Sequence, residues 1–351
     1  MAVDLTAQVG SLRLVNPIAT ASGTAGHGAE LAAYFPLARL GAIVVKSLAA
    51  LPWPGNPPPR LQPLPSGMLN SVGLQGPGVA AWLEAELPAL ERHGACVIAS
   101  IWGRTVADYE AAARLLASAP SCVAAVEVNV SCPNLEDRGK MFSNSSTATA
   151  EAICAARGAQ RPCWAKLSPN TADLIEVAGA ALSAGAEALV LTNTLLGLAI
   201  DVEHRRPVLG GVGGGVSGTP LHAVALRAVF DCRAAFPDAA IVGVGGISTG
   251  IDAVEFLMAG ANAVEVGTAT LVDPRAPVRV LDELRSWCEG RGVTRVDELV
   301  GVAQRGAVPG PDPRKDAPQR SRLGRVGPGE AGSGQEIWPS GRADPHAGGD
   351  G

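Results

Sequence analysis

The sequence predicts a fold of the α/β class, a (β/α)8 or TIM barrel, from three observations. Eight short runs rich in Val, Ile and Ala recur along the 351 residues, and each ends in a polar or glycine-rich turn. Stretches with helical periodicity lie between these runs. The GxGxxG turn that would follow the first strand of a doubly wound open sheet is missing there, so the open sheet is the second choice.

The eight runs are almost continuously apolar, which is typical of parallel strands whose outer faces are covered by helices. They occupy residues 17–23, 41–47, 95–101, 124–131, 162–168, 188–194, 239–246 and 263–268. Helical patterning occupies residues 79–94, 105–119, 171–185, 222–236 and 250–260. This alternation of strands and helices along the chain predicts a closed parallel barrel.

Capping residues support the helix boundaries. Thr105 and Thr171 stand where N-caps are expected, because their hydroxyls can accept the free N–H groups of a first turn. Gly94, Gly185 and Gly260 stand where C-caps are expected, because glycine adopts the left-handed backbone there without strain.

The two ends of the chain depart from this alternation. Residues 4–17 predict a small hairpin that precedes the barrel and plugs its bottom. From about Arg305 the chain becomes rich in Pro, Gly and charge and loses apolar periodicity. We therefore expect a barrel domain over residues 1–305 and a disordered tail over residues 306–351.

Composition excludes several classes of function. The net charge is −5, and no basic run occurs before the last 50 residues, which disfavours nucleic-acid and membrane-surface binding. The seven cysteines are scattered without a CxxC spacing, so neither a metal site nor an iron–sulfur cluster is expected in this chain. Reduced thiols, no secretory signal and no apolar run of membrane-spanning length predict a cytoplasmic protein.

Polar residues gather at the ends of the predicted strands. Active sites of such barrels lie at the carboxyl ends of the strands. The residues at these ends are Ser22, Lys46, Ser47, Ser100, Asn129, Cys132, Lys166, Asn193, Thr194, Gly245, Gly246, Gly267 and Thr268. So many polar and glycine ends on one rim favour a ligand pocket over packing.

Two features of this rim suggest chemistry. The glycine turns after the last two strands, GVGGISTG and VGTATLVD, expose backbone N–H groups that can bind a phosphate. Cys132 lies in NVSCPN, where Pro133 ends the strand and is expected to keep the thiol at the mouth. A thiol there is a candidate for proton abstraction, although a buried cysteine that only fills space is an equal alternative.

Motifs along most of the chain resemble those of the dihydroorotate dehydrogenase family, class 1. The resemblance spans about residues 4–304. The motifs that carry it are ASGTAG (21–26), GNPPPRL (55–61), GMLNSVGLQGPG (67–78), NVSCPN (129–134), KLSPN (166–170), TNT (192–194), GGVGGGVSG (210–218), GVGGI (243–247) and GTA (267–269). Cysteine at 132 resembles class 1, and the GNPPPR loop resembles class 1B most.

The resemblance implies an FMN enzyme that oxidises dihydroorotate to orotate. Cys132 would be the general base for C5, while hydride passes from C6 to the flavin and Lys166 stabilises the reduced flavin. The implied FMN contacts are Ser22, Lys46, Ser47, Ser100, Asn129, Lys166, Thr192, Gly218, Gly245, Gly246, Gly267 and Thr268. The implied substrate contacts are Lys46, Asn70, Ser71, Val72, Gly73, Leu74, Asn129, Asn193 and Thr194.

The class 1B resemblance also implies a homodimeric core and a partner subunit with FAD and a 2Fe–2S cluster, giving a heterotetramer that reduces NAD. The chain departs from the family pattern at Ser100, where asparagine is usual, at Gly76 of GLQG and at Thr192. These departures put the flavin contact at position 100 and the substrate preference in question.

Three other functions fit parts of the pattern. An FMN barrel that acts on another dihydropyrimidine, similar to dihydropyrimidine dehydrogenase, would share the cysteine base. A non-catalytic flavoprotein would fit the changes at Ser100 and in the tail. A phosphate-binding isomerase without flavin would leave Lys46, Cys132 and Lys166 unexplained together.

Overall fold

The computed structural model describes residues 3–132 and 141–306, all within one unit, Met1–Ala307. The eight predicted strands are confirmed and form one parallel sheet in the order β3-β16-β15-β10-β9-β8-β7-β4. Ala19 of β3 also bridges Ala42, next to β4, which joins the two ends of the sheet. The sheet is a closed barrel, and the open-sheet alternative is wrong. The strands are β3 (Ile18–Thr20), β4 (Ile43–Val44), β7 (Val97–Ile101), β8 (Val123–Asn129), β9 (Cys163–Leu167), β10 (Ala188–Leu191), β15 (Ala240–Val244) and β16 (Ala263–Val266).

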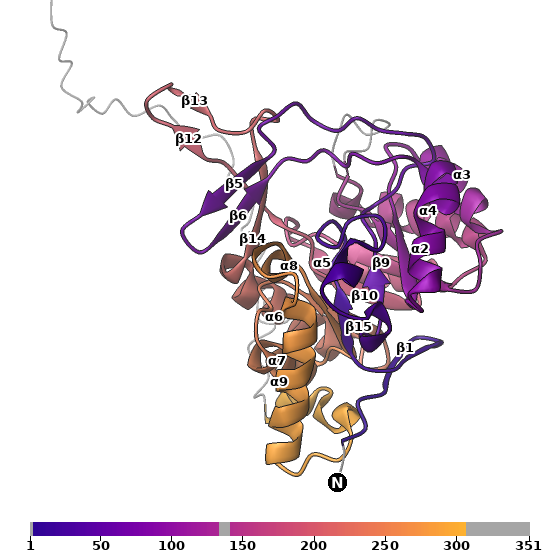
Figure 1. Ribbon diagram of the computed structural model, residues 1–351, viewed down its shortest axis with the longest axis vertical. Helices are drawn as coiled ribbons and strands as arrows, with labels where there is room; N and C mark the ends of the chain where they lie inside the picture. Colours follow the sequence, from indigo (N-terminus) through magenta and orange to yellow (C-terminus); the bar gives the residue numbers. More distant parts are fainter. Residues whose placement is uncertain (1–2, 133–140, 307–351) are drawn as a thin grey trace, which may run out of the picture. The chain divides into compact units, whose positions relative to one another are not determined.

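Helices pack around the barrel (Figure 1). They are α1 (Val79–Ala85), α2 (Leu87–Arg92), α3 (Val106–Leu116), α4 (Ser146–Ala156), α5 (Leu174–Ser183), α6 (His222–Ala235), α7 (Gly250–Ala259), α8 (Thr268–Val272) and α9 (Ala276–Gly290). The stretch 79–94 is two helices rather than one, because Pro88 lies in the first turn of α2 and cannot continue α1. Short 3₁₀ turns cover Glu30–Ala33, Leu37–Arg39, Phe142–Asn144, Arg157–Ala159, Thr219–Leu221, Val296–Leu299 and Val302–Gly306.

The capping predictions are partly confirmed. Thr105 caps α3 in a capping box with Asp108. Gly94, Gly185 and Gly260 have φ of 65°, 99° and 128°, as their places after helices require. The N-cap at Thr171 is wrong, because α5 begins three residues later and the Thr171 hydroxyl instead accepts the N–H of Asp173.

Thr105→Ala is expected to lower the free energy of unfolding by about 1 kcal/mol, because α3 loses its N-cap hydrogen bond. Thr171→Ala is the matched control and should change the free energy of unfolding by less than about 0.5 kcal/mol, since Thr171 caps no helix. Urea unfolding measures both. Equal losses in the two variants would contradict the capping assignment.

The predicted N-terminal hairpin is confirmed as β1 (Ala7–Val9) paired with β2 (Leu12–Leu14). Val9 and Leu14 are buried in the same apolar cluster as Trp164 and Ala188, whose side chains lie inside the barrel. The N–H of Ser11 donates to Glu187, directly before β10, at 2.9 Å. The hairpin therefore plugs the amino-terminal end of the barrel.

A second sheet, which the sequence did not predict, follows two of the barrel strands. It is antiparallel, in the order β11-β14-β6-β5, and a separate pair joins β12 to β13. Figure 1 shows β12 and β13 at the end of a projecting arm near β5 and β6. The strands are β5 (Leu61–Leu64), β6 (Gly67–Asn70), β11 (Leu195–Gly197), β12 (Ile200–Asp201), β13 (Arg206–Pro207) and β14 (Gly214–Gly218).

Side chains inside the barrel change from apolar to polar toward its mouth. Alternate residues of a strand point inward, and the lower positions form one apolar cluster that includes Val44, Ile98, Ala125, Trp164 and Ala263. Two residues further along β7, β8, β9 and β16, the inward residues are Ser100, Glu127, Lys166 and Glu265. We call these four residues the polar layer.

The predicted disordered tail lies outside the described residues, apart from Gly306. Within residues 3–132 and 141–306, no helix has both the length and the hydrophobicity needed to cross a membrane.

Candidate active site

A cavity of about 700 Å³ lies at the carboxyl-terminal mouth of the barrel. Strand ends form its floor, and residues of the second sheet line it as well. Nearly all of the predicted site residues border this one cavity. They are Ser22, Lys46, Ser47, Asn70, Ser71, Val72, Gly73, Leu74, Asn129, Lys166, Thr192, Asn193, Thr194, Gly218, Gly245, Gly246, Gly267 and Thr268.

Hydroxyl and amide groups form a chain of hydrogen bonds at the cavity floor. The hydroxyls of Ser22 and Ser47 lie 3.2 Å apart. The Asn129 amide donates to the Ser47 hydroxyl at 3.3 Å, and the Asn193 amide donates to Asn129 Oδ1 at 3.1 Å. These contacts fix the orientation of two amides at the cavity. Each amide can both donate and accept hydrogen bonds, so the two can bind a ligand that offers both kinds of group.

Ser100 does not line the cavity, contrary to its predicted place on the rim. Its side chain is fully buried, 2.9 Å from the Ser47 hydroxyl, and it donates to Glu127 Oε1 at 3.0 Å. Because Ser100 is an inward residue of the polar layer, its short side chain ends below the floor. It supports residues that line the cavity.

Cys132 is also buried, contrary to the expectation that Pro133 keeps its thiol at the mouth. The thiol donates to the Asn129 carbonyl at 3.6 Å, and burial raises its pKa to about 12. Backbone hydrogen bonds turn this segment toward the 3₁₀ turn at Phe142, whose N–H donates to the Cys132 carbonyl at 3.1 Å. Its neighbours Asn129 and Ser131 line the cavity, but Cys132 does not. Pro133 and Asn134 lie outside the described residues.

Lys166 connects the cavity to the polar layer. Its ammonium lies 3.0 Å from Glu265 Oε2 and 3.4 Å from Glu127 Oε2. Burial lowers the pKa of Lys166, but the two carboxyl groups together raise it above its usual value. Sequence reasoning missed both glutamates. The signal was an acidic residue at an inward position of an apolar strand, in AVEVNV and in AVEVGT.

Lys46 is the second lysine at the cavity, and its side chain is half-buried. Burial lowers its pKa, and the positive charge of Arg60 lowers it further. Among the described residues, no carboxylate lies within ion-pair distance of its ammonium. Burying an ammonium without a partner is costly, so this position suits an anionic ligand group.

The predicted substrate loop, residues 70–74, is held by a residue that the sequence analysis did not single out. Asn56 lines the cavity and donates to the Ser71 hydroxyl at 2.8 Å. Arg60 in turn donates to the Asn56 carbonyl at 2.6 Å and to Gln75 at 2.8 Å. The signal was the GNPPPR motif, which contributed to the resemblance without a role for its asparagine.

The glycine turns after the last two strands border the cavity as expected. Gly246 has φ of 68°, and a Cβ there would lie 2.7 Å from the Cβ of His222. Glycine is therefore required for α6 to pack against this turn. Nearby, the buried hydroxyl of Thr192 has no hydrogen-bond partner among the described residues. Phosphate binding at these turns stays a prediction.

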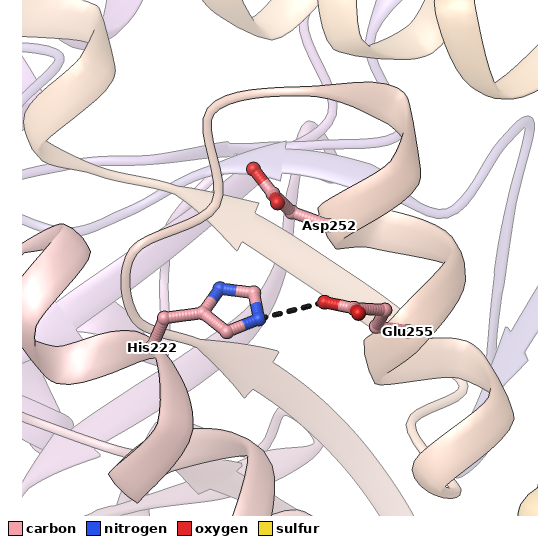
Figure 2. A group of neighbouring side chains, drawn as sticks. All are labelled: His222, Asp252 and Glu255. Atoms are coloured by element: carbon pink, nitrogen blue, oxygen red, sulfur yellow. Dashed lines mark hydrogen bonds and ion pairs between the residues drawn. The ribbon is translucent and has the colours of Figure 1, made fainter.

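One acidic cluster lies on α6 and α7. His222, Asp252 and Glu255 could bring ligand atoms within 4.8 Å of one another. Figure 2 shows a hydrogen bond between His222 and Glu255, with Asp252 apart from it. The distance from His222 Nε2 to Glu255 Oε2 is 2.9 Å. Asp252 Oδ2 already accepts the N–H groups of Ser248 and Thr249 as part of the cap of α7. These contacts account for the cluster, and we assign no metal to it.

Fold and cavity together define a barrel protein with a cavity at the carboxyl-terminal mouth that is bordered by two lysines and several amides. The chain belongs to the dihydroorotate dehydrogenase family, whose profile matches residues 4–287. The resemblance found in the motifs is thus confirmed.

Its relatives include a protein of Desulforudis audaxviator, 47% identical over 306 residues, which cover 87% of this chain and 99% of the relative. A protein of Geobacter metallireducens is 43% identical over 86% of this chain and 98% of the relative. One of Pelobacter propionicus is 42% identical over 87% of this chain and all of the relative. Each is named dihydroorotate dehydrogenase B (NAD(+)), catalytic subunit, so the expected likeness to class 1B is confirmed.

Proposed function

We propose that this chain oxidises dihydroorotate to orotate in pyrimidine biosynthesis, as the catalytic subunit of a class 1B enzyme. The observation that carries this proposal is a cavity bordered by two lysines, of which only one has an ion-pair partner among the described residues. Lys166 is paired with carboxyl groups, whereas Lys46 has none among the described residues. An ammonium without a partner suits the carboxylate of dihydroorotate.

We infer that FMN is the cofactor. A volume of about 700 Å³ is within the usual range for ligand pockets, and the cavity combines glycine turns with the unpartnered hydroxyl of Thr192. Bound FMN would supply the acceptor for the hydride that leaves C6 of the substrate. The residues that would hold it are Ser22, Lys46, Ser47, Asn129, Lys166, Thr192, Gly218, Gly245, Gly246, Gly267 and Thr268. Ser100 would act through Ser47.

The residues of this chain divide the remaining work. Residues 70–74, Asn193 and Thr194 would bind and orient the pyrimidine ring, together with Asn129. Cys132 would accept the proton from C5, which requires its side chain to leave the Asn129 carbonyl and reach the substrate. Lys166 would supply positive charge where negative charge develops on reduction.

We also propose that electrons leave through a partner subunit. The relatives are named catalytic subunits of NAD(+)-dependent enzymes, which favours a partner that passes electrons to NAD. We expect this partner to carry FAD and a 2Fe–2S cluster and to bind a homodimeric core in a heterotetramer. The cytoplasmic location and the disordered tail stay predictions.

Purified full-length protein tests the proposal. We expect it to be yellow, and to lose its flavin absorbance and form orotate when dihydroorotate is added without oxygen. Turnover of dihydrouracil or dihydrothymine alone would favour the dihydropyrimidine dehydrogenase-like alternative. A colourless protein that binds no FMN would refute the proposal.

Lys46→Met should weaken orotate binding by about tenfold or more, since a hydrogen bond to a charged group contributes about 1.5–3 kcal/mol. Calorimetric titration of orotate measures the change in Kd. Arg104→Met is the control, because Arg104 stacks on Trp53 and does not line the cavity. Unchanged orotate affinity in Lys46→Met would exclude Lys46 as the carboxylate ligand.

A further inference from the structure

Three ionisable side chains meet inside the barrel, and the proposed reaction uses only one of them. Lys166 comes from β9, Glu127 from β8 and Glu265 from β16. Both glutamates are fully buried, and the Oε2 atom of each lies within 3.4 Å of the Lys166 ammonium. One cation therefore faces two carboxyl groups away from solvent.

The charge of this cluster depends on how many carboxyl groups are ionised. Two carboxylates with one ammonium would leave a net negative charge inside the barrel, and burial disfavours such a charge strongly. The residues paired with Glu265 on the strands at either side, Val244 and Ala19, carry no charge that could compensate. The charged groups that act on Glu265 are Glu127 and Lys166. One carboxyl group is therefore expected to keep its proton.

Hydrogen bonds identify which carboxyl group that is. Glu127 accepts from two donors, the Ser100 hydroxyl at Oε1 and the Lys166 ammonium at Oε2, and donors at both oxygens favour a carboxylate. Glu265 Oε1 has no partner among the described residues. Burial and the neighbouring Glu127 also raise the pKa of Glu265 well above its ordinary value.

We propose that Glu265 is a positioning residue that keeps its proton at neutral pH, so that its carboxylic acid and the Glu127 carboxylate hold the Lys166 ammonium in a cluster without net charge. This proton count depends on the three side chains alone. The proposal also has a consequence for a bound flavin: the charge of the Lys166 ammonium beside it is balanced by the Glu127 carboxylate. This consequence rests on the proposed function.

The pH dependence of unfolding tests the proton directly. In the unfolded chain the pKa of Glu265 is about 4.3, the usual value for a glutamate side chain. If the folded chain keeps the proton, folding takes up one proton above that pH, and the stability contributed by Glu265 falls as pH rises. In the Glu265→Gln variant, folding takes up no proton at this position. Urea unfolding of the full chain should show the unfolding constant of the unmodified protein rising relative to Glu265→Gln, by about tenfold per unit between about pH 5 and 8. A ratio that does not change with pH would overturn the proposal.

Glu127→Gln gives a second, independent result. Glu265 would then be the one carboxyl group of the cluster and should lose its proton to pair with Lys166. The variant should therefore show the same pH dependence as Glu265→Gln, whereas the exposed Glu110→Gln should behave like the unmodified protein. If the unfolding constant of Glu127→Gln depended on pH as that of the unmodified protein does, the proton would not be the one shared out by this cluster, and the proposal would be overturned. If Glu127→Gln does not fold, the Glu265→Gln comparison alone decides.

The flavin potential tests the consequence. Because each single variant leaves the cluster neutral, the equilibrium constant for two-electron flavin reduction should change by less than about tenfold, which corresponds to about 30 mV. A larger shift in Glu265→Gln would mean that Glu265 carries charge and would overturn the proposal. Protein without flavin would refute the proposed function, but the unfolding data would still decide where the proton resides.

Discussion

Cys132→Ser is expected to slow flavin reduction by dihydroorotate by about 10²-fold or more while FMN stays bound. A serine hydroxyl is a far weaker base than a thiolate, and loss of a general base costs rates of this size. Anaerobic stopped-flow absorbance measures the reduction, and the flavin spectrum measures FMN content. The matched control is Cys163→Ser, because this thiol is also buried and donates to a backbone carbonyl at 3.6 Å. Unchanged reduction in Cys132→Ser would remove Cys132 from the mechanism.

The raised pKa of Cys132 adds a pH signature to the same experiment. Burial holds this pKa at about 12, so the thiol is mostly protonated at neutral pH. Below the pKa, the thiolate fraction rises with pH, and the rate of flavin reduction should rise with it. The serine variant should lack this rise. A rate that falls as pH increases would contradict a thiolate base.

Lys166→Met is expected to lower the free energy of unfolding by about 3–5 kcal/mol. Removing one partner of a buried ion pair leaves the other charge uncompensated, and here that charge is on Glu127. Urea unfolding at pH 7 measures the loss. Adding Glu127→Gln to Lys166→Met should restore much of the stability, because it removes that charge.

Arg114→Met is the surface control for this series. Arg114 pairs with Glu110 on the exposed face of α3, and its loss should cost less than about 1 kcal/mol. A loss in Lys166→Met as small as that of Arg114→Met would contradict a coupled cluster. The cluster would also be contradicted if the double variant of Lys166→Met and Glu127→Gln were no more stable than Lys166→Met alone.

Much of the site could be predicted because strand ends in a barrel converge. Once residues such as Lys46, Asn129 and Lys166 are placed at carboxyl ends of parallel strands, closure of the barrel brings them to one rim. The number of residues between them in the sequence then says little about whether they meet, whereas the position of each residue on its strand says much. Glu127 and Glu265 could have been found by the same rule, since each lies two residues before a strand end or turn and faces inward.

Side-chain direction was harder to predict than position. Cys132 and Ser100 were expected at the mouth from their places in the chain, but both are buried. Ser100 points into the barrel, in the layer below the residues that line the cavity. Contacts from the turn at Phe142 bury Cys132. The second sheet was missed because its strands are short, and because its central pair, β6 with β14, joins segments about 150 residues apart.

The sequence by itself determined the eight strands, the hairpin at the bottom, most of the rim residues and the family, because hydrophobic periodicity and local motifs are properties of neighbouring residues. Tertiary structure decided the closure between Ala19 and Ala42, the burial of Cys132, and the meeting of Lys166 with two glutamates. These depend on contacts between strands distant in the chain. Such contacts also set the local dielectric, and therefore the protonation that Cys132 and Glu265 adopt.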